Sequence, residues 1–552
     1  MKTIACLLAV GVTEVVSAAV PFYMIRLRSC ETDDEQVWAE TRAALEANRG
    51  CCDEVWFSTG ISYPPLEAHR ARAAKQAKAA ADCRRLGIEP GLQIQATLGH
   101  SDDITVSGGD VSAKDWTGWT GSQGVEDKWC SCPRDPKFIA YFEEVGRIYA
   151  AYRPTSVWID DDLRIGNHRP ATDGSLPGCW CARCVGDFAR ETGVVRTREA
   201  LAAAVKADAA LAARWERFQF ASLAELARRI AKAVAEVSPE TRMGYQHCLR
   251  ADGLQTLVYD AMRDASGHAV RSRPGGGAYF DYEPRDQLIK AYFMARQRAA
   301  ISGAKDIEQF CPEIETCPRK FSCRTPRGVL LESLENLALG MDSLSFLITD
   351  SRFEKMSWYG RTFFRALAEN RACLYGYAEA SRGAEPTGLR YAPVGKAGAE
   401  VRELRWTAYC SGVPLVGALG RDVGAYDDFV RRNGGKLDVT ASSTAEIVGR
   451  SQLADQVAGG RLPVVLEDPV VGFVMPRTTA SGELKTVAFV NTSIGCTEPT
   501  RLKLRGVPQA AKTARWWALD ARPVELPLAR SGAEAHVVLP PVEGWSAGWL
   551  GF

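Results

Sequence analysis

The sequence predicts an α/β fold in which a (β/α)8 TIM barrel is followed by a small α/β domain and a C-terminal antiparallel β-sandwich. Two observations predict the barrel. Strand-like and helix-like segments alternate eight times between residues 21 and 375, and one strand-like segment, 156–162, ends in three carboxylates. The sandwich is predicted because short alternating strands with Pro and Gly turns follow residue 484. A doubly wound open sheet is the alternative, but its typical glycine-rich phosphate loop does not follow the first strand.

The eight expected barrel strands are short runs rich in β-branched and aromatic residues. They cover residues 21–29, 53–59, 91–98, 156–162, 242–247, 269–280, 306–315 and 343–349. Each is followed by a segment with apolar residues at helical spacing. These helices cover residues 33–47, 65–86, 138–152, 196–237, 254–265, 285–301, 326–339 and 358–375. The segment 99–133 is too long for a simple connection and is expected to be a binding loop.

Changes in sequence texture divide the chain into four parts. The first part has Lys2, an apolar run and small residues at its end, which is typical of a secretory signal peptide, although Glu14 interrupts the run. We therefore expect a periplasmic or secreted protein, with a cytoplasmic one as the alternative. The expected parts are the signal peptide at 1–19, the barrel at 20–384, the small α/β domain at 385–478 and the β-sandwich at 479–552.

Composition narrows the partners of the protein. The formal net charge of +1 predicts no basic surface for nucleic acid. Beyond the N-terminal segment, no run approaches the ~20 apolar residues of a membrane span. Seventeen cysteines without regular pairing do not indicate a disulfide framework. We expect neither nucleic acid nor a membrane span as a partner, and a homo-oligomer remains open.

Two groups of carboxylates are expected at the C-terminal ends of barrel strands, where such barrels have their active sites. Asp160, Asp161 and Asp162 end the fourth strand, and Glu313 and Glu315 end the seventh. Strand alternation would place Asp160 and Asp162 on one side and Asp161 on the other. The fourth and seventh strands lie across the barrel from each other, so the two groups can face one another. Opposed carboxyl groups are what glycoside hydrolysis needs, whereas helix capping or pairing with arginine is the structural alternative.

Three cysteines at C-x-C-x-x-C spacing follow the fourth strand. Cys179, Cys181 and Cys184 would supply three thiolate ligands on one loop, and Cys132 is the expected fourth, with Cys130 in reserve. Four thiolates leave no open position for water, so we expect a structural zinc and no organic cofactor. Free thiols or a disulfide are the alternative.

Other residues near the expected strand ends could bind a substrate. Asp161, Arg164 and His168 accompany the acids, while His100 and the pair Tyr245 and His247 end the third and fifth strands. Trp116 and Trp119 in the long loop could stack on a sugar or pack in the core. The glycine-rich segment 273–277 lacks the residues of a phosphate loop, and we interpret it as a turn that permits close backbone approach.

The motifs around the acids and cysteines resemble those of the β-galactosidases of glycoside hydrolase family 42 (GH42). A strand ending in acids precedes C-x-C-x-x-C and the helix start Cys184-Val-Gly-Asp-Phe188; Cys132-Pro lies upstream, and Glu315-Thr-Cys-Pro318 downstream. The resemblance implies a retaining mechanism, an acid/base at Asp162, a nucleophile at Glu315 and a four-cysteine zinc site beside the pocket. One departure is that the Asn-Glu pair of the family is Asp161-Asp162 here.

Together these observations predict a glycoside hydrolase acting on a β-galactoside-like or related hexoside. Asp162 or Asp160 would donate the proton and Glu315 or Glu313 would be the nucleophile. Carboxyl groups about 5–5.5 Å apart would indicate retention, and about 6.5–9.5 Å inversion. The alternatives are a non-catalytic carbohydrate-binding protein on a TIM barrel and a metal-dependent hydrolase working at the cysteines. A divalent ion held by Asp160 and Asp162 is less favoured.

Overall fold

The structure is a computed structural model. It describes residues 20–61, 63–99, 114–165, 176–193, 195–248, 253–281, 284–320, 322–391, 412–417, 419–434 and 444–552. The expected signal peptide at 1–19 and two expected substrate-binding residues, His100 and His168, lie outside the described residues. None of the helices in these ranges is long and apolar enough to span a membrane.

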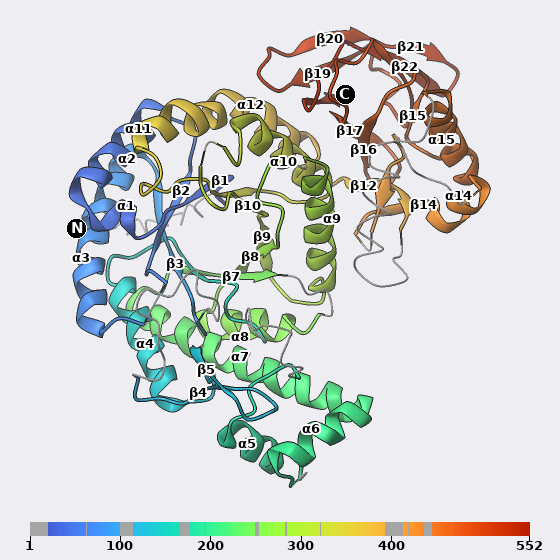
Figure 1. Ribbon diagram of the computed structural model, residues 1–552. Helices are drawn as coiled ribbons and strands as arrows, with labels where there is room; N and C mark the ends of the chain where they lie inside the picture. The colour runs from blue at the N-terminus through green and yellow to red at the C-terminus, as the bar shows by residue number, and fades with distance from the viewer. Residues whose placement is uncertain are drawn as a thin grey trace, which may run out of the picture.

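A curled, fully parallel sheet forms the first part of the chain and confirms the predicted barrel (Figure 1). Its order is β10-β11-β1-β2-β3-β6-β7-β8-β9. The strands are β1 (Tyr23–Arg26), β2 (Glu54–Ser58), β3 (Glu89–Ile94), β6 (Ser156–Ile159), β7 (Arg242–Cys248), β8 (Val270–Gly275), β9 (Ile307–Phe310), β10 (Glu313–Glu315) and β11 (Leu344–Leu347).

The expected seventh strand is divided into two pieces. β9 pairs with β8, whereas β10 pairs with β11, and Cys311-Pro312 separates them. Proline has no N–H to donate to a ladder, which accounts for the interruption at Pro312. The Cys311 N–H still donates to Ser272 O of β8 over 2.9 Å. The two pieces therefore close the ring between β8 and β11 at one strand position, which makes eight positions in all.

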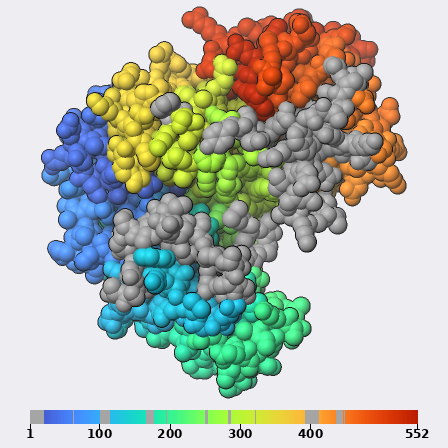
Figure 2. Space-filling view, viewed as in Figure 1, coloured from blue at the N-terminus to red at the C-terminus, as the bar shows by residue number. Residues whose placement is uncertain are grey.

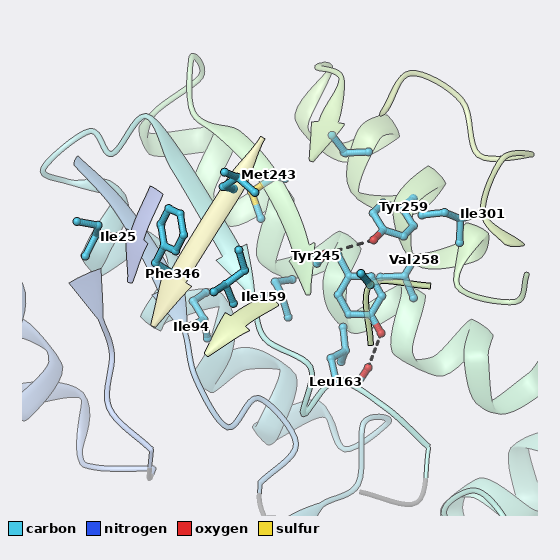
Figure 3. Packing of buried hydrophobic residues seen from close by; sticks show 14 of the residues in the cluster. Ile25, Ile94, Ile159, Leu163, Met243, Tyr245, Val258, Tyr259, Ile301 and Phe346 are labelled. Atoms are coloured by element: carbon cyan, nitrogen blue, oxygen red, sulfur yellow. Dashed lines mark hydrogen bonds between the residues drawn. The ribbon is translucent and has the colours of Figure 1, made fainter. Parts of the chain in front are cut away.

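Helices surround the sheet in the predicted order (Figure 1). They are α1 (Cys30–Asp33), α2 (Glu35–Ala47), α3 (Leu66–Leu86), α4 (Pro136–Ala150), α5 (Ala182–Thr192), α6 (Arg198–Ala207), α7 (Ala209–Val237), α8 (Thr256–Ser266), α9 (Pro284–Ala300), α10 (Pro326–Ala338), α11 (Met356–Tyr359), a π-helical turn (Gly360–Phe364) and α12 (Arg365–Ala380). Between the sheet and these helices lies a continuous apolar core that includes Ile25, Ile94, Ile159 and Phe346 (Figure 3). Burying each such side chain contributes roughly 1.5–3 kcal/mol.

The interior of the barrel is filled by side chains. Trp56 and Trp158 stack with ring centroids 4.2 Å apart, and Met24 and Cys311 complete this cluster. A Cβ atom on Gly244 would lie 2.3 Å from the Trp158 ring, so glycine at this position makes room for the indole. Because the interior is packed, a substrate can enter only at the mouth formed by the C-terminal strand ends.

The predicted long loop contains a two-stranded hairpin, β4 (Gly118–Thr120) and β5 (Glu126–Ser131). It precedes α4, which Asp135 caps: the Asp135 carboxylate accepts the N–H of Lys137 over 2.9 Å, and Pro136 occupies the first helical position. α5 and α6 lie beside this hairpin, at the bottom of Figure 1. The hairpin and α5 thus form one projection at the side of the barrel.

The C-terminal part contains two further sheets. β12 (Glu385–Arg390) pairs in parallel with β13 (Leu415–Val416) and β14 (Arg421–Ala425), and antiparallel with β16 (Gly472–Thr478). The remaining strands of that sheet are β17 (Leu484–Asn491), β23 (Ala547–Gly551), β19 (Thr513–Ala518) and β20 (Val524–Pro527). The second sheet contains β15 (Val464–Leu466), β18 (Thr500–Arg505), β22 (Glu534–Leu539) and β21 (Ala529–Ser531). The described residues of this part also include the helices α14 (Tyr426–Arg432) and α15 (Thr444–Val457).

The α/β segment and the sandwich share one sheet, because β12 pairs with β16, and β16 pairs with β17. The two sheets enclose a separate apolar core. Figure 2 shows this part as a lobe against the barrel. Trp549 fastens the lobe to α12, since its indole N–H donates to Cys373 O over 3.0 Å.

Candidate active site

The mouth of the barrel joins two arginines to three carboxylates: Arg26, Arg273, Asp161, Glu313 and Glu315. The Arg273 guanidinium lies 2.7 Å from Glu313 through Nη1 and 3.7 Å from Asp161 through Nη2. Arg26 Nη1 lies 3.4 Å from Glu315 Oε2 and 4.0 Å from Glu313 Oε1. The acids after the fourth and seventh strands therefore meet at shared guanidinium groups.

Glu313 is buried, and both of its carboxylate oxygens accept hydrogen bonds. Its carboxylate accepts hydrogen bonds from Arg273, from the Gly276 N–H over 2.9 Å and from the Tyr279 hydroxyl over 3.2 Å. Burial is the largest influence on its pKa and would raise it, but the charges of Arg273, Lys290 and Arg26 together outweigh burial, and the pKa is lowered. A Cβ atom on Gly275 would lie 2.9 Å from the carboxylate, which agrees with the close backbone approach predicted for 273–277. Glu313 is thus an ionised residue that holds this turn.

Glu315 is the more accessible of the two glutamates, with a side chain 13% exposed. Arg319 forms an ion pair with its carboxylate, in addition to Arg26. The main-chain carbonyl of Glu315 accepts a hydrogen bond from Arg324 Nη1 over 2.8 Å, and Arg324 in turn pairs with the buried Glu332. Both the carboxylate and the backbone of Glu315 are therefore held in place.

The three aspartates lie on a turn, because β6 ends at Ile159. Because they lie outside the strand, the predicted strand alternation does not apply to them. Asp160 faces the end of β3 and accepts hydrogen bonds from the N–H of Ala96 and from the N–H and hydroxyl of Thr97. Burial, together with the neighbouring aspartates, raises its pKa.

Asp161 reaches the mouth instead, with a side chain 27% exposed. Burial would raise its pKa, but Arg273 and Arg164 outweigh it and lower the pKa, so Asp161 is ionised. Asp162 is 5% exposed and lies 3.5 Å from Arg164 Nη2. Arg164 Nη1 also donates to Cys248 Sγ over 2.7 Å, so this arginine ties the aspartate turn to the end of β7.

Tyr245 and His247 on β7 are buried next to the aspartate turn and help to hold it in place. The Tyr245 hydroxyl donates to Leu163 O over 2.7 Å and so holds the turn that follows Asp162 (Figure 3). His247 Nδ1 lies 2.7 Å from the Tyr259 hydroxyl. Burial and the nearby Arg273 charge lower the pKa of His247 to about 3, so its ring is neutral. Both side chains are at most 2% exposed and act as supports in this structure.

Trp116 and Trp119, the two loop tryptophans considered as a stacking surface, pack in the core. Trp119 is 3% exposed. Trp116 packs against Tyr63, Phe138 and Tyr141, with ring centroids 5.3–5.7 Å apart. Neither indole stands free beside the carboxylates as a stacking surface.

The four expected cysteines come together between β5 and α5. The sulfur atoms of Cys132, Cys179, Cys181 and Cys184 lie within 4.8 Å of one another, and all four residues are buried. Cys132 Sγ is 3.5 Å from Cys184 Sγ and 3.6 Å from Cys181 Sγ. Disulfide sulfurs would be about 2.05 Å apart. Four thiolates at about 2.3 Å from one tetrahedral zinc would be separated by about 3.8 Å, so these residues fit that ion. Cys130 is not in the cluster; its thiol donates to Gly99 O.

Sequence reasoning missed three residues of the mouth: Arg26, Arg273 and Tyr279. A signal was present for the arginines, because each interrupts a strand expected to be buried, and a buried charge needs a partner. Tyr279 follows the glycine turn and carried no local signal.

Comparison with known proteins identifies the fold. No protein-family model matches the sequence, and no curated protein matches it. A solved catalytic mutant of Gan42B, a GH42 β-galactosidase from G. stearothermophilus, is 10% identical, with 96% of this chain and 98% of that chain covered and a TM-score of 0.57. A β-galactosidase from Bacillus circulans sp. alkalophilus has the same identity and coverage and a TM-score of 0.55. One from the psychrophilic Marinomonas ef1 is 8% identical, with 96% and 100% covered and a TM-score of 0.51.

The chain has the fold of these β-galactosidases. The likeness spans the barrel, the α/β segment and the sandwich, because it covers nearly the whole chain. It confirms the resemblance to GH42 at the level of fold. At identities near 10%, the roles of individual residues rest on the site itself.

Proposed function

We propose that this protein is a glycoside hydrolase, retaining in mechanism, that cleaves a β-galactoside-like or related hexoside with two carboxylates. The observation that carries the proposal is that Asp161, which adjoins Asp162, shares Arg273 with Glu313, while Arg26 is shared by Glu313 and Glu315, at the open end of the barrel. The fold shared with solved β-galactosidases supports the same reaction class.

Glu315 is the proposed nucleophile. It is more exposed than Glu313, and Glu313 is occupied by three hydrogen-bond donors. Two guanidinium groups, Arg26 and Arg319, stabilise the negative charge that a nucleophilic carboxylate needs. The arginine at its carbonyl holds the carboxylate in position for attack on the anomeric carbon.

Asp162 is the proposed general acid/base. Asp160 is turned toward β3, where it accepts three hydrogen bonds, and the lowered pKa of Asp161 makes it a poor proton donor. Asp161 is then an ionised group that binds sugar hydroxyls or assists the departing group. Arg164, within reach of Asp161 and Asp162, would orient both.

Aryl glycosides provide the direct test. Glu315→Gln and Asp162→Asn should each lower kcat by at least a hundredfold on the best substrate, as expected for loss of a catalytic carboxylate. Glu354→Gln, a neutralised carboxylate on the β11–α11 loop, is the matched control and should retain activity. Full activity in both catalytic variants would contradict the assignment, and product stereochemistry by NMR would separate retention from inversion.

A non-catalytic carbohydrate-binding protein is the second candidate. It is favoured by the extent to which arginines and backbone N–H groups already engage the acids, as at Asp160 and Glu313. In that case the native protein would bind sugars without turnover, and the amide variants of Glu315 and Asp162 would still bind them.

We further propose that the four-cysteine cluster holds a structural zinc, which would clasp the hairpin to α5. Metal analysis of the purified protein should then find one zinc per chain, which is lost in Cys132→Ser and kept in Cys130→Ser. Chelation should lower the melting temperature. A metal-dependent hydrolase would instead lose turnover on chelation while its melting temperature stayed unchanged.

We also propose that the protein is exported to the periplasm or the medium. N-terminal sequencing of protein recovered from the medium or periplasm would detect cleavage after residue 19 and would separate export from the cytoplasmic alternative.

A further inference from the structure

The rim of the barrel beside Glu315 carries four cationic side chains from three neighbouring loops. The loops follow β1, β10 and β11, which are adjacent and parallel in the sheet (Figure 1), so they lie side by side at the C-terminal end. The cations are Arg28, Arg319, Lys320 and Arg352, and we refer to them as the basic rim.

Contacts between the loops show that these charges lie close together. Lys320 Nζ is 4.8 Å and Arg352 Cζ is 5.8 Å from the centroid of the Phe353 ring. Asp350 joins two of the loops, because it lies 3.5 Å from Arg28 Nε and 2.7 Å from Arg352 Nη2. The Phe353 ring is 40% exposed, so this part of the rim is open to solvent.

The carboxylates that pair with the rim cations do not balance their positive charge. Glu315 is shared with Arg26, which does not belong to the rim, and Asp350 serves two arginines. Burial raises the pKa of Glu31 to about 7, so this third carboxyl is only partly ionised at neutral pH. Lys320 is exposed, and no carboxylate in the described part of the chain forms an ion pair with it.

Two of the arginines are partly deprived of water as well. Arg319 is 6% exposed, and within the described ranges its Nε has no hydrogen-bond partner. Burial and the charge of Arg319 lower the pKa of Arg28, although Asp350 opposes them. A guanidinium in such surroundings is stabilised when an anion binds beside it.

We propose that the basic rim binds an acidic group of the sugar, so that the preferred substrate is an anionic glycoside such as a hexuronide. This inference rests on the proposed function. Arg319 belongs to the rim and also pairs with Glu315, so the bound acid lies on the sugar unit whose anomeric carbon meets that glutamate, or on its neighbour. A hexuronic acid carries its carboxylate on the same ring as its anomeric carbon, and arginine binds carboxylates through paired N–H donors.

Matched aryl glycosides test the inference. The kcat/KM of the native protein is measured on an aryl β-galactoside, the corresponding β-galacturonide and a 6-sulfated β-galactoside. We expect at least one anionic substrate to exceed the neutral one by about tenfold or more, the scale of one charged hydrogen bond. Preference for the uronide over the sulfated sugar would identify a carboxylate, and the reverse preference a sulfate ester.

Single substitutions in the basic rim test whether its cations cause the preference for anionic substrates. Arg28→Met and Lys320→Met should each remove most of the anionic preference while changing neutral-substrate kcat/KM less than threefold. Lys305→Met, an exposed lysine ahead of β9 at the opposite end of the barrel, is the matched control and should retain the preference.

The outcomes separate the inference from the proposed function. Hydrolysis of the neutral glycoside without an anionic preference would overturn the basic-rim proposal and leave the hydrolase intact. Hydrolysis of none of the three would overturn the hydrolase. In that case, calorimetry with galacturonic acid tests the basic-rim proposal. Binding that is weaker in Lys320→Met than in the native protein supports the proposal, and absence of binding to the native protein overturns it.

Discussion

Replacing Arg273 with methionine should destabilise the barrel through a single buried charge. Arg273 has no exposed surface and donates to Glu313 over 2.7 Å. Methionine fills similar space without a charge, so Glu313 would lose its nearest cation inside the protein. Breaking a buried ion pair in this way costs about 3–5 kcal/mol. Both side chains are at most 3% exposed, so solvent screening does not reduce this figure.

The destabilisation should depend on pH. The lowered pKa of Glu313 in the native protein contributes stability that is present above its unfolded value of about 4.3 and is lost as the pH falls through the folded value. In Arg273→Met, burial is no longer opposed by that charge, so the folded-state pKa should rise above the unfolded one. The deficit of the variant should therefore be largest near neutral pH and should shrink toward pH 4.5.

Urea unfolding at pH 7 and pH 4.5 measures both effects, with tryptophan fluorescence as the signal because Trp56 and Trp158 lie inside the barrel. The double variant Arg273→Met/Glu313→Leu removes both charges and should be more stable than Arg273→Met alone. A loss below about 1 kcal/mol at pH 7, the size of an ordinary substitution, or a loss of equal size at both pH values would refute the reasoning.

Three further predictions concern β7. Gly244→Ala would place a Cβ atom 2.3 Å from the Trp158 ring, and overpacking of this kind costs about 1–3 kcal/mol, measurable as a lower urea midpoint. Tyr245→Phe leaves the Leu163 carbonyl without its donor, so we expect a loss of about 1–2 kcal/mol and lower kcat/KM, because the aspartate turn loosens; unchanged values of both would contradict this role. The lowered pKa of His247, about 3, contributes stability that is present above the unfolded value of about 6.5 and is lost below it, so His247→Gln should lose less stability than the native protein between pH 6.5 and 4. Equal losses in urea midpoint would count against a neutral buried imidazole.

Local sequence patterns were sufficient for the order of the elements. Alternation of strand-like and helix-like segments located the barrel strands, because period-2 and period-3.6 patterns are properties of short windows. The cysteine cluster was also predictable: three of its members share one short loop, and chain order singled out Cys132, which follows β5 directly. The glycine turn at 273–277 was recognised as a place of close approach for the same local reason.

The sequence by itself therefore determined the fold class, the strand ends that carry acids and the set of clustered cysteines. Only the tertiary structure decided which acids meet. β6 ends at Ile159, so Asp161 rather than its neighbours reaches Arg273, and Pro312 divides the seventh strand just before Glu313. The contact between Asp161 and Arg273 joins residues more than a hundred positions apart in the chain. The free energy of a buried ion pair depends on how far folding removes water from both partners. A local sequence pattern does not predict that burial.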